Sequence, residues 1–203
     1  RPPYAARPRQ LSVTRIETLV RDPYQIYASR VLRLSKLNPL TQSADPRDRG
    51  TAFHKVMEEF VAQTREETPN EGAARLIATA ERVLEETVLW PAARRVWLGR
   101  LKKIALPLVV REVENRAKGM PIATEIKGAY HFKDIDFSLT CEADRIDQTQ
   151  GGDYIIYDYK TGSPPTKKQT ETLNMQLHLE AIMLENGGFS GLNAGRVFEL
   201  AYL

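Results

Sequence analysis

The stretch from Asp153 to Lys160 constrains the fold more than any other part of this sequence. It reads Asp-Tyr-Ile-Ile-Tyr-Asp-Tyr-Lys, so most of its residues are aromatic or β-branched, and glycines precede and follow it. This composition predicts a short buried strand between two turns. Side chains two positions apart share one face of a strand, so we expect Asp158 and Lys160 to converge on one small site.

The preceding segment, residues 138–147, also alternates and is expected to form a hairpin with this strand. A loop centred near Gly151 places Asp144 opposite Asp158, roughly 5 Å apart at Cβ. Two such carboxylates repel each other, so one keeps its proton with a raised pKa unless a divalent cation lies between them. Two alternatives stay open. In the first, Asp144 forms a surface ion pair with a cation such as Arg145. In the second, a one-residue slip in register separates the two acids.

The composition is that of an ordinary globular protein. Of 203 residues, 42% are hydrophobic and 27% charged, and the net charge of +3 permits nucleic acid binding without indicating it. The single cysteine, Cys141, excludes an internal disulfide and a multi-thiolate metal site, which favours a reducing, cytoplasmic setting. The sequence has no apolar run long enough to cross a bilayer, so no membrane association is expected. The prolines and arginines of residues 1–10 predict an extended linker.

Residues 51–62 have the pattern of an amphipathic helix that carries His54 and Glu58. Residues four apart share a helix face, so Glu58 is placed to fix the tautomer of a metal-binding His54. The alternative is an ordinary pair on the helix surface. The metal-site interpretation requires this helix to dock beside the hairpin of Asp144 and Asp158.

Residues 72–119 are helical by pattern, with an interruption at Trp90-Pro91 and a kink or break before Pro107. Arg94 and Arg95 belong to a basic cluster there, which either runs along DNA phosphates or forms a solvated helix face. After Gly119 the pattern changes to strands at 122–132, 135–147 and the central strand, then a helix at about 168–184 and a strand at 196–203. This order predicts an α/β fold with a mixed sheet.

Four motifs resemble a known family. Gly50-x-x-x-His54, Asp144-Arg-Ile-Asp147, Asp158-Tyr-Lys160 and Gln176-Leu177 occur in the order typical of RecB-type nucleases of the PD-(D/E)XK superfamily. The segment Leu-Ser-Val-Thr-Arg-Ile-Glu and the run Gln-Leu-x-Leu-Glu-Ala further resemble the C-terminal nuclease domain of AddB, a double-strand break repair protein, in an alphaproteobacterial style. The resemblance implies a restriction-endonuclease-like core, α-β-β-β-α-β with a mixed sheet, and an additional helical region. Residues 11–203 are then one nuclease domain, in which 11–119 are mainly helical and carry the histidine and 120–203 form the catalytic sheet and helix.

The resemblance also implies a site. His54, Asp144, Asp158 and the backbone carbonyl of Tyr159 match ligands of Mg²⁺ or Mn²⁺, and Lys160 matches the lysine that orients the attacking water. Gln176 matches a glutamine near the active site and the DNA, so the expected catalytic residues are Asp144, Asp158, Lys160 and Gln176. The residues expected to contact DNA are Arg145, Lys167, Lys168, Arg94 and Arg95.

The function implied is exonucleolytic hydrolysis of single-stranded DNA, the 5′-ended strand, in a bacterial heterodimer with an AddA-type helicase-nuclease subunit. The chain has no Gly-x-x-x-x-Gly-Lys-Ser/Thr loop, so the motor must be that partner. The chain departs from the family at three positions. Cys141 stands where relatives often have glycine, Glu180 where many have tyrosine, and Asp22 where many have the first cysteine of an iron-sulfur cluster. No such cluster is expected here. Two other classes remain open: a catalytically silent nuclease-like module that binds or guides DNA, and an unrelated α/β scaffold whose acids form surface pairs.

Overall fold

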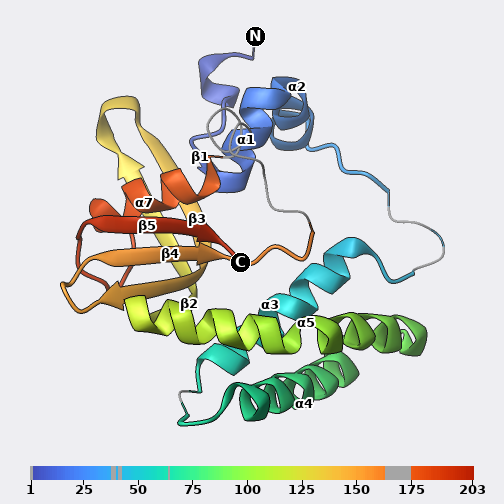
Figure 1. The fold of residues 1–203 in the computed structure, drawn as a ribbon. Coiled ribbons are helices and arrows are strands. Elements are labelled where there is room, and N and C mark those ends of the chain that lie inside the picture. The colour runs from blue at the N-terminus through green and yellow to red at the C-terminus, as the bar shows by residue number, and fades with distance from the viewer. Residues whose placement is uncertain (1, 38–39, 41–42, 64, 163–174) are drawn as a thin grey trace.

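The computed structural model describes residues 2–37, 40, 43–63, 65–162 and 175–203 (Figure 1). Its helical elements are η1 (Tyr4–Ala6), α1 (Val13–Arg21), α2 (Pro23–Ile26), η2 (Tyr27–Val31), α3 (Pro46–Val61), α4 (Pro69–Thr87), α5 (Pro91–Lys118), η3 (Lys133–Ile135) and α7 (Gln176–Glu185). Its strands are β1 (Gln10–Ser12), β2 (Gly119–Phe132), β3 (Phe137–Thr149), β4 (Tyr154–Asp158) and β5 (Val197–Tyr202).

The strands form one mixed sheet around β3. Strand β2 runs antiparallel to β3 along one edge. On the other edge β1 pairs in parallel with the start of β3, and β4 pairs antiparallel with its end. Strand β5 then lies parallel to β4. From α3 onward, with α4 and α5 inserted after it, the chain follows the predicted order of helix, three strands, helix and strand, which confirms the mixed α/β fold.

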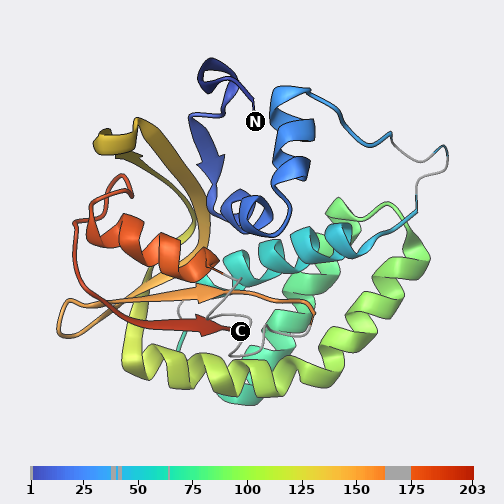
Figure 2. The same cartoon turned by 90° about the horizontal axis from the view of Figure 1, so that it is seen from above.

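Two hydrophobic cores flank the sheet. Helices α1 and α7 pack on one side, where Val13, Leu177 and Met183 join strand residues such as Ala143 and Ile156. Helices α3, α4 and α5 form a second core of their own, which Tyr159 enters from the end of β4. The views in Figures 1 and 2 show this helical layer beside the sheet. The end of β4 therefore lies where the two cores meet.

The helix boundaries follow from local signals. Capping boxes start both α3, at Asp45 with Asp48, and α4, at Thr68 with Glu71, and each helix begins with proline. Helix α5 begins at Pro91, which confirms the predicted interruption. It continues through Pro107 and bends partway along its length (Figure 2), as a helix does where proline removes one backbone donor.

Two predicted boundaries differ from the structure. The expected linker at residues 1–10 contains η1 and supplies Gln10 to β1, because the backbone carbonyl of Arg9 accepts a hydrogen bond from Ser138 N at the start of β3 (2.8 Å). Within the described residues, the expected helix at about 168–184 is seen as α7, from Gln176 onward, and its first part lies outside them. In the part of the chain that the structure describes, no helix is both long and apolar enough to cross a membrane.

Candidate metal centre and active site

The β3–β4 hairpin has the register predicted from the sequence. Arg145 pairs with Tyr157 and Ile146 with Ile156, so one further step brings Asp144 opposite Asp158. Beyond the last strand residue, Tyr159 N donates a hydrogen bond of 2.7 Å to Asp144 Oδ2. Both aspartates are buried. The one-residue slip is therefore excluded, and the two acids share one end of the hairpin.

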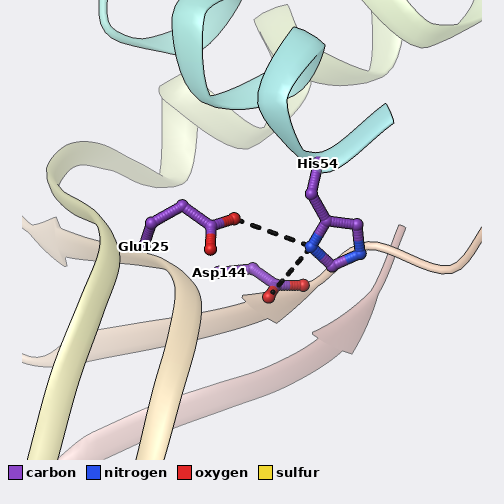
Figure 3. A group of neighbouring side chains, drawn as sticks. All are labelled: His54, Glu125 and Asp144. Atoms are coloured by element: carbon purple, nitrogen blue, oxygen red, sulfur yellow. Dashed lines mark ion pairs between the residues drawn. The ribbon is translucent and has the colours of Figure 1, made fainter. Parts of the chain in front are cut away.

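Helix α3 docks beside this hairpin and brings His54 to the two strands. The imidazole Nδ1 lies 3.3 Å from Asp144 Oδ1 and 3.6 Å from Glu125 Oε1 (Figure 3). On the other side of the ring, Nε2 lies 3.0 Å from the carbonyl oxygen of Tyr159. The docking required for a metal-site interpretation of His54 is thus present, and a simple pair on the helix surface is not what the structure shows.

Glu125 is the acid that our sequence analysis missed. It lies in β2, where Thr124 pairs with Arg145 and Ile126 with Ala143, so Glu125 stands opposite Asp144. Its φ of 47° is in the left-handed region, which is unfavourable for any residue other than glycine. The strand ends expected from the sequence, 132 and 135, place Asp144 opposite Ala123, whereas the turn in the structure pairs Phe132 with Phe137, so a count across this turn does not find Glu125.

The three side chains fit a hard divalent cation. One ligand atom from each of His54, Glu125 and Asp144 lies within 4.8 Å of the others. Two carboxylate oxygens and one imidazole nitrogen suit Mn²⁺, and Mg²⁺ accepts such a carboxylate pair while keeping waters in its remaining positions. The pKa of His54 is raised to about 10 by hydrogen bonds to Asp144 and Glu125, so without a metal a proton balances the two acids.

Asp158 lies next to this group and has partners of its own. Its Oδ2 is 2.5 Å from Lys160 Nζ, and its Oδ1 accepts a hydrogen bond of 2.7 Å from Gln176 Nε2. The pKa of Asp158 is raised by burial and by the negative charge of Asp144, which is the conflict expected for two neighbouring carboxylates. The Asp158 carboxylate thus contacts Lys160 and Gln176, and it lies beside the group of His54, Glu125 and Asp144.

Helix α7 adds a third buried acid, Glu180, beside Asp144 and Asp158. Gln176 Nε2 also donates to Glu180 Oε1 at 3.2 Å, and Glu180 is fully buried. Burial raises the pKa of Glu180 to about 8; the hydrogen bond from Gln176 acts against that rise, and the charges of Asp158 and Asp144 add to it. Glu180 is therefore largely protonated at neutral pH in the metal-free protein, so only one of the two carboxyl groups that contact Gln176 needs to carry a charge.

Residues 10–203 match the sequence profile described as the PD-(D/E)XK nuclease superfamily. The chain belongs to this superfamily. The three-residue signature in its name, an acid, any residue and lysine, corresponds here to Asp158, Tyr159 and Lys160 at the end of β4.

Similar proteins are found in Rickettsia. The chain is 32% identical over 194 residues to a protein of Rickettsia conorii and 31% identical over 186 residues to one of Rickettsia bellii, both described only as uncharacterized. These matches cover 92% and 90% of this chain but only 23% and 22% of the relatives. The PD-(D/E)XK chain therefore spans less than a quarter of the length of the relatives it matches.

Two predicted roles need correction. Arg145 was expected to contact DNA, but its side chain is fully buried and holds both oxygens of Asp147 at 2.6 Å and also Glu112. The Arg145 side chain therefore connects β3 to α5 through its ion pair with Glu112. Glu58 was expected to orient His54, but both ring nitrogens of His54 contact other groups and Glu58 pairs with Lys55 at 2.8 Å. Helical spacing alone did not show that Glu58 pairs with Lys55 and not with the ring.

The other predicted DNA contacts stay predictions. Arg94 and Arg95 lie near the start of α5, and Arg94 Nε donates to the carbonyl oxygen of Val88. Lys167 and Lys168 lie outside the described residues. The candidate site of the described chain thus consists of residues from α3, β2, β3, α7 and the end of β4.

Proposed function

We propose that this chain is a metal-dependent nuclease that hydrolyses phosphodiester bonds of single-stranded DNA. The observation that carries the proposal is the 2.5 Å contact between Asp158 and Lys160 at the end of β4, beside the group of His54, Glu125 and Asp144. An acid and a lysine held together next to a cation site can position a water and a phosphate at the same point.

Each residue has a defined part in this proposal. His54, Glu125 and Asp144 would hold the cation, which when bound lowers the pKa of a water and offsets charge on the phosphate. Lys160 is 31% exposed at its side chain, so its ammonium is accessible to a phosphate or a water, whereas Asp158 is buried behind it. Gln176 holds the Asp158 carboxylate through its amide nitrogen.

The narrower part of the proposal concerns the biological setting. The ordered motifs resemble AddB-type nuclease domains, which supports a role in processing double-strand breaks in the bacterial cytoplasm. In that role the chain acts on the 5′-ended strand delivered by an AddA-type helicase-nuclease subunit. Pull-down of an AddA-type subunit from cells that express the whole protein tests this part separately from the chemistry.

The chemistry is tested by degradation of end-labelled single-stranded DNA with Mg²⁺, Mn²⁺ or EDTA. We expect metal-dependent cutting that falls by about 100-fold or more in Asp158→Ala and Lys160→Ala, the range found when a group acting directly in catalysis is removed. Asp153→Ala is the matched control, because this aspartate lies at the opposite end of the same strand, just before β4. Metal binding without any cutting by the unaltered chain would instead favour a catalytically silent DNA-binding module.

A further inference from the structure

A groove beside Lys160 lies outside the group of residues described above. It encloses about 540 Å³ between α3, α5 and the ends of β4 and β5. Its floor is apolar and includes Phe53, Leu101, Ile104 and Leu108. Tyr159, Lys160 and Thr161 also line it, so the groove borders the lysine of the candidate active site.

The charges around the groove all have one sign. Arg49, Arg100, Lys103 and Lys160 line it, and no aspartate or glutamate is among the described residues that do. A second pocket of about 550 Å³ opens beside His54, and its lining includes Glu58 and Glu125 as well as cations. A polyanion is therefore attracted to the groove beside Lys160 more than to the pocket beside His54.

Three of the four cations of the groove form no ion pair with a described residue, whereas Lys160 pairs with Asp158 at 2.5 Å. Among the ion pairs that the described residues form, none involves Arg100 or Lys103, whereas Lys102 between them pairs with Glu81 at 2.9 Å. Arg49 donates through Nη2 to the carbonyl oxygen of Thr161, and its buried Nε has no hydrogen-bond partner among the described residues. On α5, Arg100, Lys103 and Ile104 are three and four positions apart, so they share one helix face.

The apolar floor selects the kind of polyanion. In a duplex the base faces are stacked inside and only base edges and the sugar-phosphate backbone reach the surface, so an apolar floor has no base face to bind. An unpaired strand presents base faces as well as phosphates, and proteins bind it with cations that follow the backbone and apolar or aromatic side chains under the bases. A volume of about 540 Å³ is in the range of pockets that hold small molecules, so one or two nucleotides fit.

We infer that this groove binds an unpaired segment of DNA and delivers the adjoining phosphate to Lys160. The bases lie on Phe53 and Ile104, and the phosphates contact Arg100 and Lys103. The inference deepens the proposed nuclease function and rests on it, because it names the path by which a single strand reaches the site.

The test separates binding from cutting. A fluorescent thymidine oligonucleotide is titrated with the chain in EDTA, where no cutting occurs, and anisotropy gives the affinity at several salt concentrations. The double variant Arg100→Glu with Lys103→Glu is expected to lower the affinity at least tenfold. It should also reduce the slope of log affinity against log salt by about 1.4, the value for two lost phosphate contacts on a single strand. Lys102→Glu is the matched control, because it changes the same charge on the same helix outside the groove.

A second variant tests the apolar floor. Ile104 is 49% exposed, so Ile104→Ser should not disturb folding, and we expect it to weaken oligonucleotide binding without changing the salt slope. Equal losses in Lys102→Glu and the double variant would overturn the inference, as would tighter binding of a blunt duplex than of the single strand. If the groove variants lose binding but the unaltered chain with Mn²⁺ never cuts DNA, the groove is upheld and the proposed nuclease function fails.

Discussion

The imidazole Nδ1 of His54 lies 3.3 Å from Asp144 Oδ1 and shares the space between Asp144 and Glu125. Hydrogen bonds to these two acids raise the pKa of His54 to about 10, against the opposing effect of burial. At neutral pH without metal, the ring is therefore protonated. Since only a neutral imidazole binds a metal ion, the proton and the cation compete for the same place.

Metal affinity should consequently rise with pH. Below the pKa of His54, each pH unit is expected to increase the apparent Mn²⁺ affinity about tenfold, with release of about one proton per ion bound. Calorimetric titration in two buffers of different ionisation enthalpy measures that proton directly. In His54→Ala the affinity should be lower and the release should disappear. Binding of Mn²⁺ with no proton release in the unaltered chain would show that His54 is not a ligand.

Glu180 should make the metal-free protein less stable at high pH. Its pKa is about 8 in the folded protein and near its ordinary value of 4.5 when unfolded, so between these values the folded state binds one proton more. Stability then falls as pH rises through this window, by as much as about 1.4 kcal/mol per pH unit. Glu180→Gln should flatten the dependence of the melting temperature between pH 5 and pH 8. The exposed Glu85→Gln on α4 should leave the curve unchanged, and parallel curves for Glu180→Gln and the unaltered chain would contradict this account.

The sequence predicted the hairpin because two short-range signals agreed there. Alternation and the glycine-containing loop fixed the register that brings Asp144 to Asp158, and β4 is buried at every position. The hairpin needs only a strand period and a count of residues across a turn. His54 was placed beside the same acids by the family resemblance and not by such a count.

The missed and misplaced residues depend on long-range packing. Glu125 reaches the site through a left-handed backbone conformation that no sequence period reveals. Arg145 lies within a motif next to a site residue, yet it faces α5, whose Glu112 is 33 residues away in the chain. Which face of a strand a particular helix covers is decided by how the layers pack, so a surface arginine and a buried one look alike in the sequence.

The buried Arg145 should contribute to folding and not to DNA binding. Its guanidinium contacts Asp147 and Glu112, and all three side chains are buried. Arg145→Met leaves the buried Asp147 without its partner, whereas Glu112 keeps Arg116 at 2.6 Å, and breaking such a buried pair costs about 3–5 kcal/mol. Urea denaturation measures the loss. Arg82→Met is the matched control, because Arg82 also pairs with two acids, Glu59 and Glu86, but on the surface, where the loss should be below about 1 kcal/mol. Similar losses in both variants would contradict the assignment.

Glu125 allows the backbone and the carboxylate to be tested separately. Its φ of 47° is strained for alanine and for glutamate but not for glycine, so Glu125→Gly should be more stable than Glu125→Ala by about 1 kcal/mol. Both variants remove the same carboxylate from the group with His54 and Asp144, so both should weaken Mn²⁺ binding equally.

Melting temperature and calorimetry on the two Glu125 variants provide both readouts. At Ile126, the next residue of β2, the φ is not positive, so the order should reverse: Ile126→Gly should be less stable than Ile126→Ala, because glycine weakens a regular strand. If alanine were the more stable replacement at both positions, the left-handed conformation of Glu125 would not be strained. Unchanged Mn²⁺ affinity in both Glu125 variants would remove Glu125 from the metal centre and leave His54 and Asp144 to hold the ion with Asp158.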